Sequence, residues 1–293
     1  MRIFIAGGTG FVGGHVRCAL LEAGHELLVL AHRRQAGWEP GIEQVEGDAT
    51  RPESYARALR GCDAVINLVG VIREFPRRGI TFERLHVGAT RGLLKAAREA
   101  GASRYLQMSA LGARPGAVSG YHGTKFRAED EVRMSGLDWT IFRPSVIFGP
   151  KDDFINRLAG MVRNLPVVPV IGNGCYRLQP IDGGDVARCF RMSLEMPETI
   201  GKTYELCGID RLAYRELIQT IGTALGRGKV RTCSLPLGLM EVVTPLFQHF
   251  PFFPITMDQI RMLVEENVCD CTWRETFRFD PVGIEEGIRV YLG

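Results

Sequence analysis

The chain has 293 residues, which is enough for one large domain or for a large domain and a small one. Its 36 basic and 33 acidic residues leave a net charge of +3, too small for the basic surface typical of nucleic-acid-binding proteins. Eight cysteines without C-x-x-C spacing and six scattered histidines form no metal-ligand pattern. We therefore expect no metal site, no nucleic-acid partner, and reduced thiols in a cytoplasmic protein.

The apolar segments of the chain are too short or too interrupted to cross a membrane. No uninterrupted run of about eighteen apolar residues exists, and the N-terminus has the pattern of a buried strand rather than of a signal peptide. Residues 235–263 are rich in Leu, Phe and Pro. This segment predicts either core packing or a peripheral contact with a membrane or a protein.

The first fourteen residues predict a nucleotide-binding turn. Residues 3–6 form an apolar run typical of a strand buried on both faces of a parallel sheet, and a helical pattern begins at Val12. Glycines between them let the backbone approach a pyrophosphate, whose charge the N-terminus of the helix stabilises. We therefore expect the dinucleotide to contact Gly7, Thr9, Gly10, Phe11, Val12 and Gly13.

The residues after the second predicted strand, 26–31, bear on the choice of cofactor. An acidic side chain there would bond the ribose 2′-hydroxyl of NAD, but the chain has His32, Arg33 and Arg34 instead. Two fixed cations favour the 2′-phosphate of NADP through charge-assisted bonds. The alternative is that these are solvated loop charges, so NADP(H) is the preferred cofactor and NAD(H) stays open.

Further strands at 42–46, 64–69 and 105–108 alternate with helical patterns. This alternation predicts an α/β fold, a Rossmann-type doubly wound parallel sheet with helices on both faces. A ligand then lies beyond the carboxyl ends of the strands. Asp48 could accept a bond from an adenine amino group or cap the next helix. The same edge would bring the following residues to the cofactor: Asp48, Ala49, Leu68, Val69, Gly70 and Met108.

Tyr121 and Lys125 form a Y-x-x-x-K pair that predicts a reaction centre. At this spacing both side chains lie on one face of a helix. A lysine cation beside the phenol, together with an oxidised nicotinamide, favours the phenolate and so lowers the pKa of the tyrosine toward the working range. Ser109, at the end of the strand 105–108, could hold the carbonyl or alcohol oxygen of a substrate.

Together these motifs resemble the short-chain dehydrogenase/reductase superfamily, in its extended or atypical epimerase/dehydratase branch. The resemblance also rests on the R-P-x-x-x-F-G-P segment at 143–150 and covers roughly residues 1–190. It implies that Pro144 and Val146 of this segment contact the cofactor. Segments 108–113 and 136–141 look closest to relatives of the nucleotide-binding accessory subunit of respiratory complex I. The resemblance implies that Ser109 orients substrate, Tyr121 is the acid/base and Lys125 binds the nicotinamide ribose. His86 stands where many relatives have Asn, which removes any proton relay through that Asn.

The alternation ends near residue 150, which predicts two domains. We expect a dinucleotide-binding domain at 1–150, to which 176–206 returns, and a smaller substrate-side region at 151–175 and 207–293. The candidate substrate residues in the second half are Phe154, Arg157, Arg177 and Gln179, for which packing or surface roles are equally open.

Three functions follow from these motifs. The first is an NADP(H)-dependent oxidoreductase acting on a small-molecule carbonyl or alcohol. The second, which follows from the resemblance, is an accessory or assembly protein of a respiratory complex that holds the nucleotide without turnover. The third is a nucleotide-sugar epimerase or dehydratase. The resemblance also implies a homodimer that pairs through helices such as 81–100 and 121–134.

Overall fold

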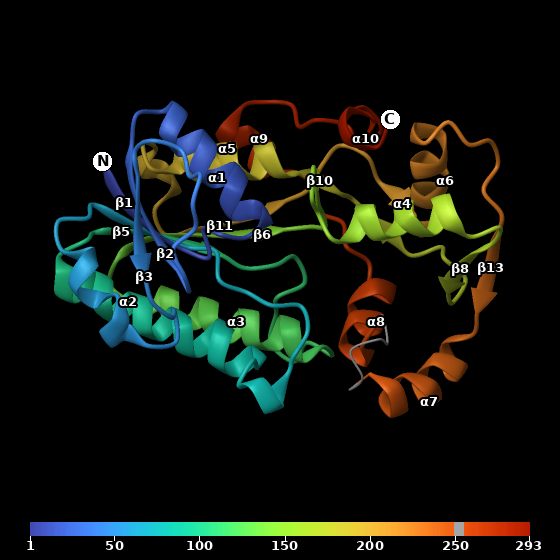
Figure 1. Cartoon of the computed structure of the whole chain (residues 1–293), viewed down its shortest axis with the longest axis horizontal. Coiled ribbons are helices and arrows are strands. Elements are labelled where there is room, and N and C mark those ends of the chain that lie inside the picture. Colours follow the sequence, from blue (N-terminus) through green and yellow to red (C-terminus); the bar gives the residue numbers. More distant parts are fainter. Residues whose placement is uncertain (249–254) are drawn as a thin grey trace. The chain divides into compact units, whose positions relative to one another are not determined.

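The computed structural model describes residues 1–248 and 255–293 of the chain (Figure 1). The backbone divides into two compact units. The first unit contains Met1–Arg143 and Val186–Tyr204, and the second contains Pro144–Asp185 and Glu205–Gly293. The division drawn from the sequence is placed later, at residue 150, and returns a longer segment, 176–206, to the first domain.

A seven-stranded sheet forms the centre of the first unit, in the order β11-β6-β5-β4-β1-β2-β3. Helices α1 (Phe11–Glu22) and α5 (Gly183–Ser193) lie on one face, and α2 (Ala89–Ala100) and α3 (Gly120–Arg133) on the other (Figure 1). The predicted doubly wound α/β class is therefore confirmed. The strands are β1 (Arg2–Ala6), β2 (Glu26–Ala31), β3 (Ile42–Glu46), β4 (Ala64–Asn67), β5 (Arg104–Met108), β6 (Asp138–Pro144) and β11 (Lys202–Leu206).

The central strand β1 shows why this sheet forms. Ile3, Phe4, Ile5 and Ala6 are fully buried, as expected for a strand covered on both faces. Ile5 lies opposite Val29 of β2 and pairs in parallel on its other side with β4. Each such buried Phe, Ile or Val contributes about 1.5–3 kcal/mol of hydrophobic free energy. The strand therefore holds the glycine turn that follows it on a rigid base.

Two helical predictions for the first unit are wrong. No helix joins β2 to β3, and only short 3-10 helices separate β3 from β4 and lie in the loop after β4. The predicted helix at 81–100 is two elements, a π-helix η4 (Glu83–Gly88) and then α2. A π-helix widens the turn by one residue, which leaves the spacing of apolar residues almost unchanged and so escapes a periodicity argument. The short 3-10 helices of the unit are η1 (Pro52–Ser54), η2 (Ala56–Leu59), η3 (Pro76–Arg78) and η5 (Pro197–Thr199).

A buried arginine ties the returning segment 186–204 to the sheet. Arg104 at the start of β5 is 7% exposed, and burial lowers its pKa to about 10. Its guanidinium donates to the carbonyl of Asp138 and to Thr140 Oγ1, and on the returning segment to Ser193 O and Thr199 Oγ1, at 2.6–2.9 Å. A fully bonded buried cation of this kind fixes a unique arrangement, because losing any partner would leave an unpaired charge.

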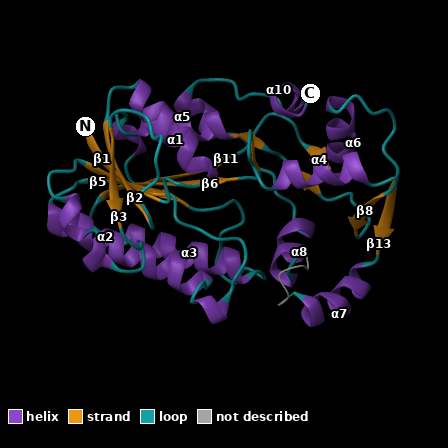
Figure 2. Ribbon diagram, viewed as in Figure 1, coloured by secondary structure: helices purple, strands orange, loops and turns teal. Residues whose placement is uncertain are grey.

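The second unit consists of helices with short two-stranded pairings (Figure 2). β7 pairs in parallel with β10, β8 in parallel with β13, and β9 antiparallel with β12. Side chains from α4, α6 and α10 share one core. Its elements are β7 (Ile147–Phe148), α4 (Phe154–Asn164), β8 (Val168–Ile171), β9 (Arg177–Leu178), β10 (Ile181–Asp182), β12 (Leu212–Ala213), α6 (Tyr214–Ala224), β13 (Thr232–Leu235), α7 (Leu237–Phe247), α8 (Met257–Val264), α9 (Trp273–Phe277) and α10 (Ile284–Leu292).

A disulfide joins Cys207, just after β11, to Cys269, which precedes α9. The expectation of reduced thiols is therefore wrong for this pair. The two cysteines are 62 residues apart, and their Cα atoms are 6.1 Å apart in the folded unit. Spacing in the sequence cannot reveal a pair that only tertiary packing brings together.

The apolar segment 235–263 contains α7 and most of α8, and part of it, including Pro251, Phe252, Phe253 and Pro254, lies outside the described residues. Met240 and Thr244 of α7 are buried, whereas Val242 and Leu246 are each 66% exposed. The helix thus packs on one side and presents apolar side chains on the other. None of the helices in the described ranges is both long enough and apolar enough to span a bilayer.

Candidate active site

The turn between β1 and α1 has the geometry of a phosphate cradle. Gly7 has a φ of +79°, and a Cβ atom there would lie 2.7 Å from the carbonyl carbon of Leu68. A Cβ at Gly13 would lie 2.6 Å from the carbonyl oxygen of Gly7. No side chain caps the N-terminus of α1, where Gly10 is the N-cap. The first N–H groups of α1 therefore stay clear of side-chain caps, and the turn fits the pyrophosphate of a dinucleotide.

The loops after β2 and β3 carry the residues expected to choose the cofactor. His32, Arg33 and Arg34 are exposed directly after β2, where a 2′-phosphate could reach them. Asp48, after β3, accepts bonds from the backbone N–H and the hydroxyl of Thr50, both at 2.8 Å. Asp48 thus stabilises its own turn and does not cap the next helix, η1, whose N-cap is Arg51; the adenine contact stays a prediction.

Lys125 joins the ends of two strands. Its ammonium, 2% exposed on α3, donates to the carbonyls of Val69 at 3.3 Å and Met108 at 3.2 Å. Burial lowers its pKa to about 8, against the attraction of Glu129. A Cβ at Gly70 would lie 2.9 Å from Lys125 Nζ, so the backbone here passes close to the ammonium. Three predicted cofactor contacts, Val69, Gly70 and Met108, therefore surround the lysine.

Tyr121 lies one turn before Lys125 on α3, and aromatic side chains surround its ring. Its ring meets those of Phe82 and His86 edge-on, with centroids 5.8 and 5.3 Å away, and Lys125 Nζ lies 6.0 Å from its centroid. Burial raises the pKa of Tyr121 to about 12. The lowering expected from the lysine together with an oxidised nicotinamide stays a prediction. Tyr121 is a protonated phenol at neutral pH.

His86 lies in the π-helix η4 and is 1% exposed. The N–H of Val71 donates to Nε2 at 3.3 Å, and Nδ1 lies 2.9 Å from Thr124 Oγ1. Nε2 is thus an acceptor and Nδ1 carries the proton, the neutral form of the ring. Burial and repulsion from Lys125 lower its pKa to about 2. His86 therefore ties the loop after β4 to α3 and does not carry a proton through the neutral range.

Ser109 differs from its predicted role. Its hydroxyl donates to Glu129 Oε1 at 2.5 Å, so its proton is not directed at a substrate oxygen. Glu129 on α3 is fully buried and also receives a bidentate bond from Arg143, at 2.8 and 2.7 Å. Glu129 is not among the residues predicted from the sequence, although its place four residues after Lys125 puts it on the same face of the helix.

The remaining predicted residues belong to the second unit and do not form one cluster. Pro144 ends β6, and Val146 donates its N–H to Asn267 Oδ1. Phe154 packs near Tyr214, and Arg157 pairs with Asp153 on its own helix. The Gln179 amide is occupied by Gly208 O, Cys269 N and Arg211 Nε, which is a structural role. Arg177 pairs with Glu266.

A match to a known protein family agrees with nucleotide binding at the glycine turn. A family model described as NAD(P)H-binding matches residues 7–155, about half of the chain. The match begins at the first glycine of the turn and continues past Lys125, so it covers the cradle and the tyrosine–lysine pair.

Curated relatives have several functions. The mitochondrial NADH dehydrogenase (ubiquinone) 1 alpha subcomplex subunit 9 of Mus musculus is 30% identical over 86% of this chain and 68% of its own. A ceramide reductase of Caulobacter vibrioides is 34% identical over 58% of this chain and 53% of its own. The structure of a UDP-glucose 4-epimerase from Thermotoga maritima has a TM-score of 0.79 at 19% identity, covering 100% of this chain and 97% of that one. This last likeness concerns the fold alone.

Proposed function

Since this chain belongs to the NAD(P)H-binding family, we propose that it is an NADP(H)-dependent oxidoreductase that reduces the carbonyl group of a small molecule. The observation that carries the proposal is the position of Lys125, bound to the ends of β4 and β5 with Tyr121 one turn away on the same helix. This places an acid beside the edge of the sheet where the glycine turn lies.

In this proposal, different residues of the first unit bind the cofactor and donate the proton. An ammonium group has three donors, and Lys125 uses two of them on Val69 O and Met108 O, which leaves one for a ribose hydroxyl. Arg33 and Arg34 would hold a 2′-phosphate. When bound, the nicotinamide supplies a hydride to the carbonyl carbon. Tyr121 then gives its proton to the carbonyl oxygen, which becomes the alcohol.

The protonated state of Tyr121 favours this direction. A phenol whose pKa burial raises to about 12 holds its proton at neutral pH, so the proton that a carbonyl reduction needs is present on Tyr121. Ser109 is a positioning residue in this proposal, because its hydroxyl supports Glu129, one turn after Lys125 on α3.

A screen of aldehydes and ketones by loss of NADPH absorbance tests the proposal. Tyr121→Phe is expected to lower turnover at least about 100-fold, the usual size of a lost general acid, with NADPH affinity unchanged in calorimetry. Tyr214→Phe, a buried tyrosine of the second unit, is the matched control. Full turnover by Tyr121→Phe would overturn the assignment.

A second candidate rests on the similarity to the alpha subcomplex subunit over 86% of the chain. In that case the chain holds NADPH as a structural ligand and contacts other proteins. This candidate predicts tight NADPH binding, no reduction of any carbonyl in the screen, and co-purification with respiratory membrane subunits. The predicted cytoplasmic location and homodimer are tested by the same preparation, through cell fractionation and size-exclusion chromatography.

A further inference from the structure

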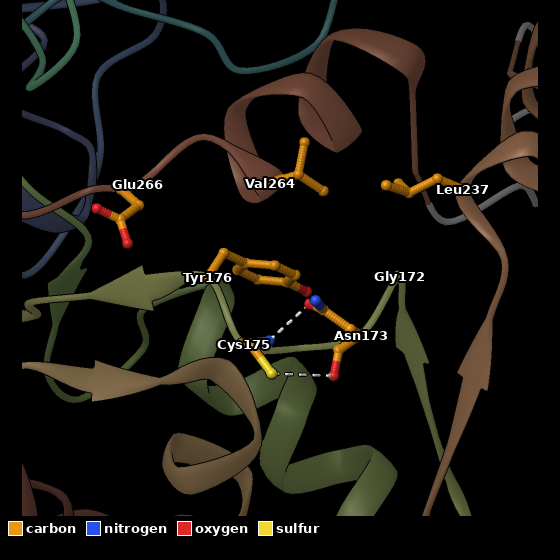
Figure 3. Close-up of a pocket in the computed structure, with 7 residues that line it drawn as sticks. All are labelled: Gly172, Asn173, Cys175, Tyr176, Leu237, Val264 and Glu266. Carbon is orange, nitrogen blue, oxygen red and sulfur yellow. Dashed lines mark hydrogen bonds between the residues drawn. The ribbon is translucent and has the colours of Figure 1, made fainter.

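The second unit contains a pocket of about 430 Å³, within the range of small-molecule sites (Figure 3). The turn after β8 and the residue before β9 supply one side, and α7, α8 and the residues after α8 supply the other. Gly172 and Gly174 in that turn have φ values of +64° and +69°, which direct the chain back toward β9. The residues that line the pocket include Asn173, Tyr176, Leu237, Val264 and Glu266.

The hydroxyl of Tyr176 is buried without a partner. The side chain is 8% exposed, and its Oη has no hydrogen bond to any described residue. Its ring stacks on Tyr214 with centroids 5.2 Å apart, so the ring cannot easily swing away. Figure 3 shows the hydroxyl end directed along the pocket toward the amide of Asn173. An unmet buried hydroxyl costs about 1–3 kcal/mol, which a ligand oxygen would recover.

The nitrogen of the Asn173 amide is a second donor at this place. Asn173 Oδ1 accepts from the N–H of Cys175 at 2.9 Å, which identifies the oxygen and leaves Nδ2 without a protein bond among the described residues. Tyr176 Oη and Asn173 Nδ2 are therefore two donors on the lining of this pocket. A carbonyl oxygen, with two lone pairs, fits this arrangement.

The charges around the pocket disfavour an anionic ligand. The only charged side chain among the lining residues is the carboxylate of Glu266. Arg177 is bound to that carboxylate at 2.8 and 3.0 Å. Arg215 gives its three nitrogens to Asn173 O, Thr232 Oγ1 and Ser234 Oγ, all neutral oxygens of the protein. Neither guanidinium is directed at a ligand phosphate.

The remaining wall is apolar and continues onto an exposed surface. Leu237 and Val264 line the pocket opposite Tyr176. Leu237 begins α7, on which Leu239, Val242 and Leu246 are 52–66% exposed. A hydrocarbon chain that leaves the pocket past Leu237 would therefore stay on apolar side chains.

We propose that this pocket binds an uncharged amphiphile, whose carbonyl oxygen accepts bonds from Tyr176 and Asn173 and whose aliphatic chain lies along Leu237 and Val264. The proposal concerns binding by the second unit and does not depend on hydride transfer. A site for a nucleoside diphosphate would instead need lysine or arginine side chains directed at the phosphates of the ligand.

Ligand-observed NMR titration of the full chain tests the proposal with four probes. Octanamide, octanoate and octylammonium share one chain length and differ in head-group charge, and UDP represents a nucleoside diphosphate. We expect octanamide to bind and octanoate to bind about tenfold more weakly, because the charged side chain that lines the pocket is the carboxylate of Glu266. Tyr176→Phe is expected to weaken octanamide binding about tenfold, whereas the control Tyr214→Phe leaves it unchanged.

Leu237→Trp provides a second variant at a partly exposed position, where the larger ring fills the pocket without disturbing the core. It is expected to abolish octanamide binding at an unchanged melting temperature. Three results would overturn the proposal: no octanamide binding by the native chain, tighter binding of octanoate or UDP, or native octanamide affinity in Tyr176→Phe. If Tyr176→Phe does not fold, native affinity in Leu237→Trp overturns it instead.

Discussion

The candidate site of the first unit is formed by backbone atoms, whereas the pocket of the second unit is lined by side chains. The cradle of the first unit is backbone, with Gly7, Gly13 and Gly70 at places where a Cβ would lie within 3 Å of a neighbouring atom. The pocket of the second unit is enclosed by side chains such as Tyr176, Leu237 and Val264. A backbone site presents the same N–H groups whatever the neighbouring side chains are, so it suits a ligand shared by many enzymes. The shape and polarity of a side-chain site change with each substitution, so such a site suits a ligand that differs from one family member to another.

The largest expected effect concerns the backbone cradle. Gly13→Ala places a methyl group 2.6 Å from the Gly7 carbonyl oxygen and Gly8, and backbone atoms cannot move aside. We expect NADPH affinity to fall about 100-fold, which corresponds to the usual cost of overpacking. Calorimetric titration measures it. Gly14→Ala is the matched control, because a Cβ there meets nothing within 4 Å; an equal loss in both variants would contradict the cradle.

The buried histidine of the first unit predicts an acid-sensitive fold. The pKa of His86 is about 2 when folded and about 6.5 when unfolded, so below pH 6.5 the unfolded chain binds a proton that the folded chain does not. Stability then falls as the pH falls. Between pH 7 and pH 5 this group removes about 2 kcal/mol of unfolding free energy.

Urea unfolding at both pH values measures this loss. His86→Gln keeps an acceptor for the Val71 N–H and is expected to lose about 2 kcal/mol less than the native chain on acidification. The exposed His32→Gln is the control and is expected to behave like the native chain. Equal acid sensitivity in all three proteins would show that His86 titrates normally.

The loop after β2 predicts a smaller effect on selectivity. Arg33→Ala removes an exposed cation that is expected to bond the 2′-phosphate, and NADPH affinity is expected to fall about tenfold while NADH affinity stays constant. Parallel titrations with the two nucleotides measure the ratio. Tighter binding of NADH than of NADPH by the native chain would refute the reading of Arg33 and Arg34.

The smallest expected effect is a difference of two titratable thiols, which comes from the disulfide of the second unit. Of the eight cysteines, the structure leaves six as thiols. Thiol titration of the denatured protein without reductant is expected to give six equivalents, and eight after reduction. Eight in both conditions would show that Cys207 and Cys269 are thiols in the isolated protein.

The sequence was informative where local pattern decides structure. Strands β2 and β3 have the predicted bounds, and the glycine turn, Lys125 and the strand ends meet as expected, because a parallel sheet brings its carboxyl ends to one edge. Contacts between distant residues were not predicted. The Ser109–Glu129 bond, the Cys207–Cys269 pair and the occupied amide of Gln179 each join residues 20 or more positions apart.

The hydrogen bonds of the buried Arg104 bear on the order in which the chain folds during synthesis. Four of its bonds need Asp138, Thr140, Ser193 and Thr199, and the edge strand β11 comes from residues 202–206. A ribosome releases β1 to β6, and with them Asp138 and Thr140, long before Ser193, Thr199 and β11. The nascent nucleotide-binding unit therefore carries a partly bonded buried cation and an open sheet edge until Pro144–Asp185 of the other unit and its own returning segment have emerged. Cofactor binding during synthesis would begin only after that point.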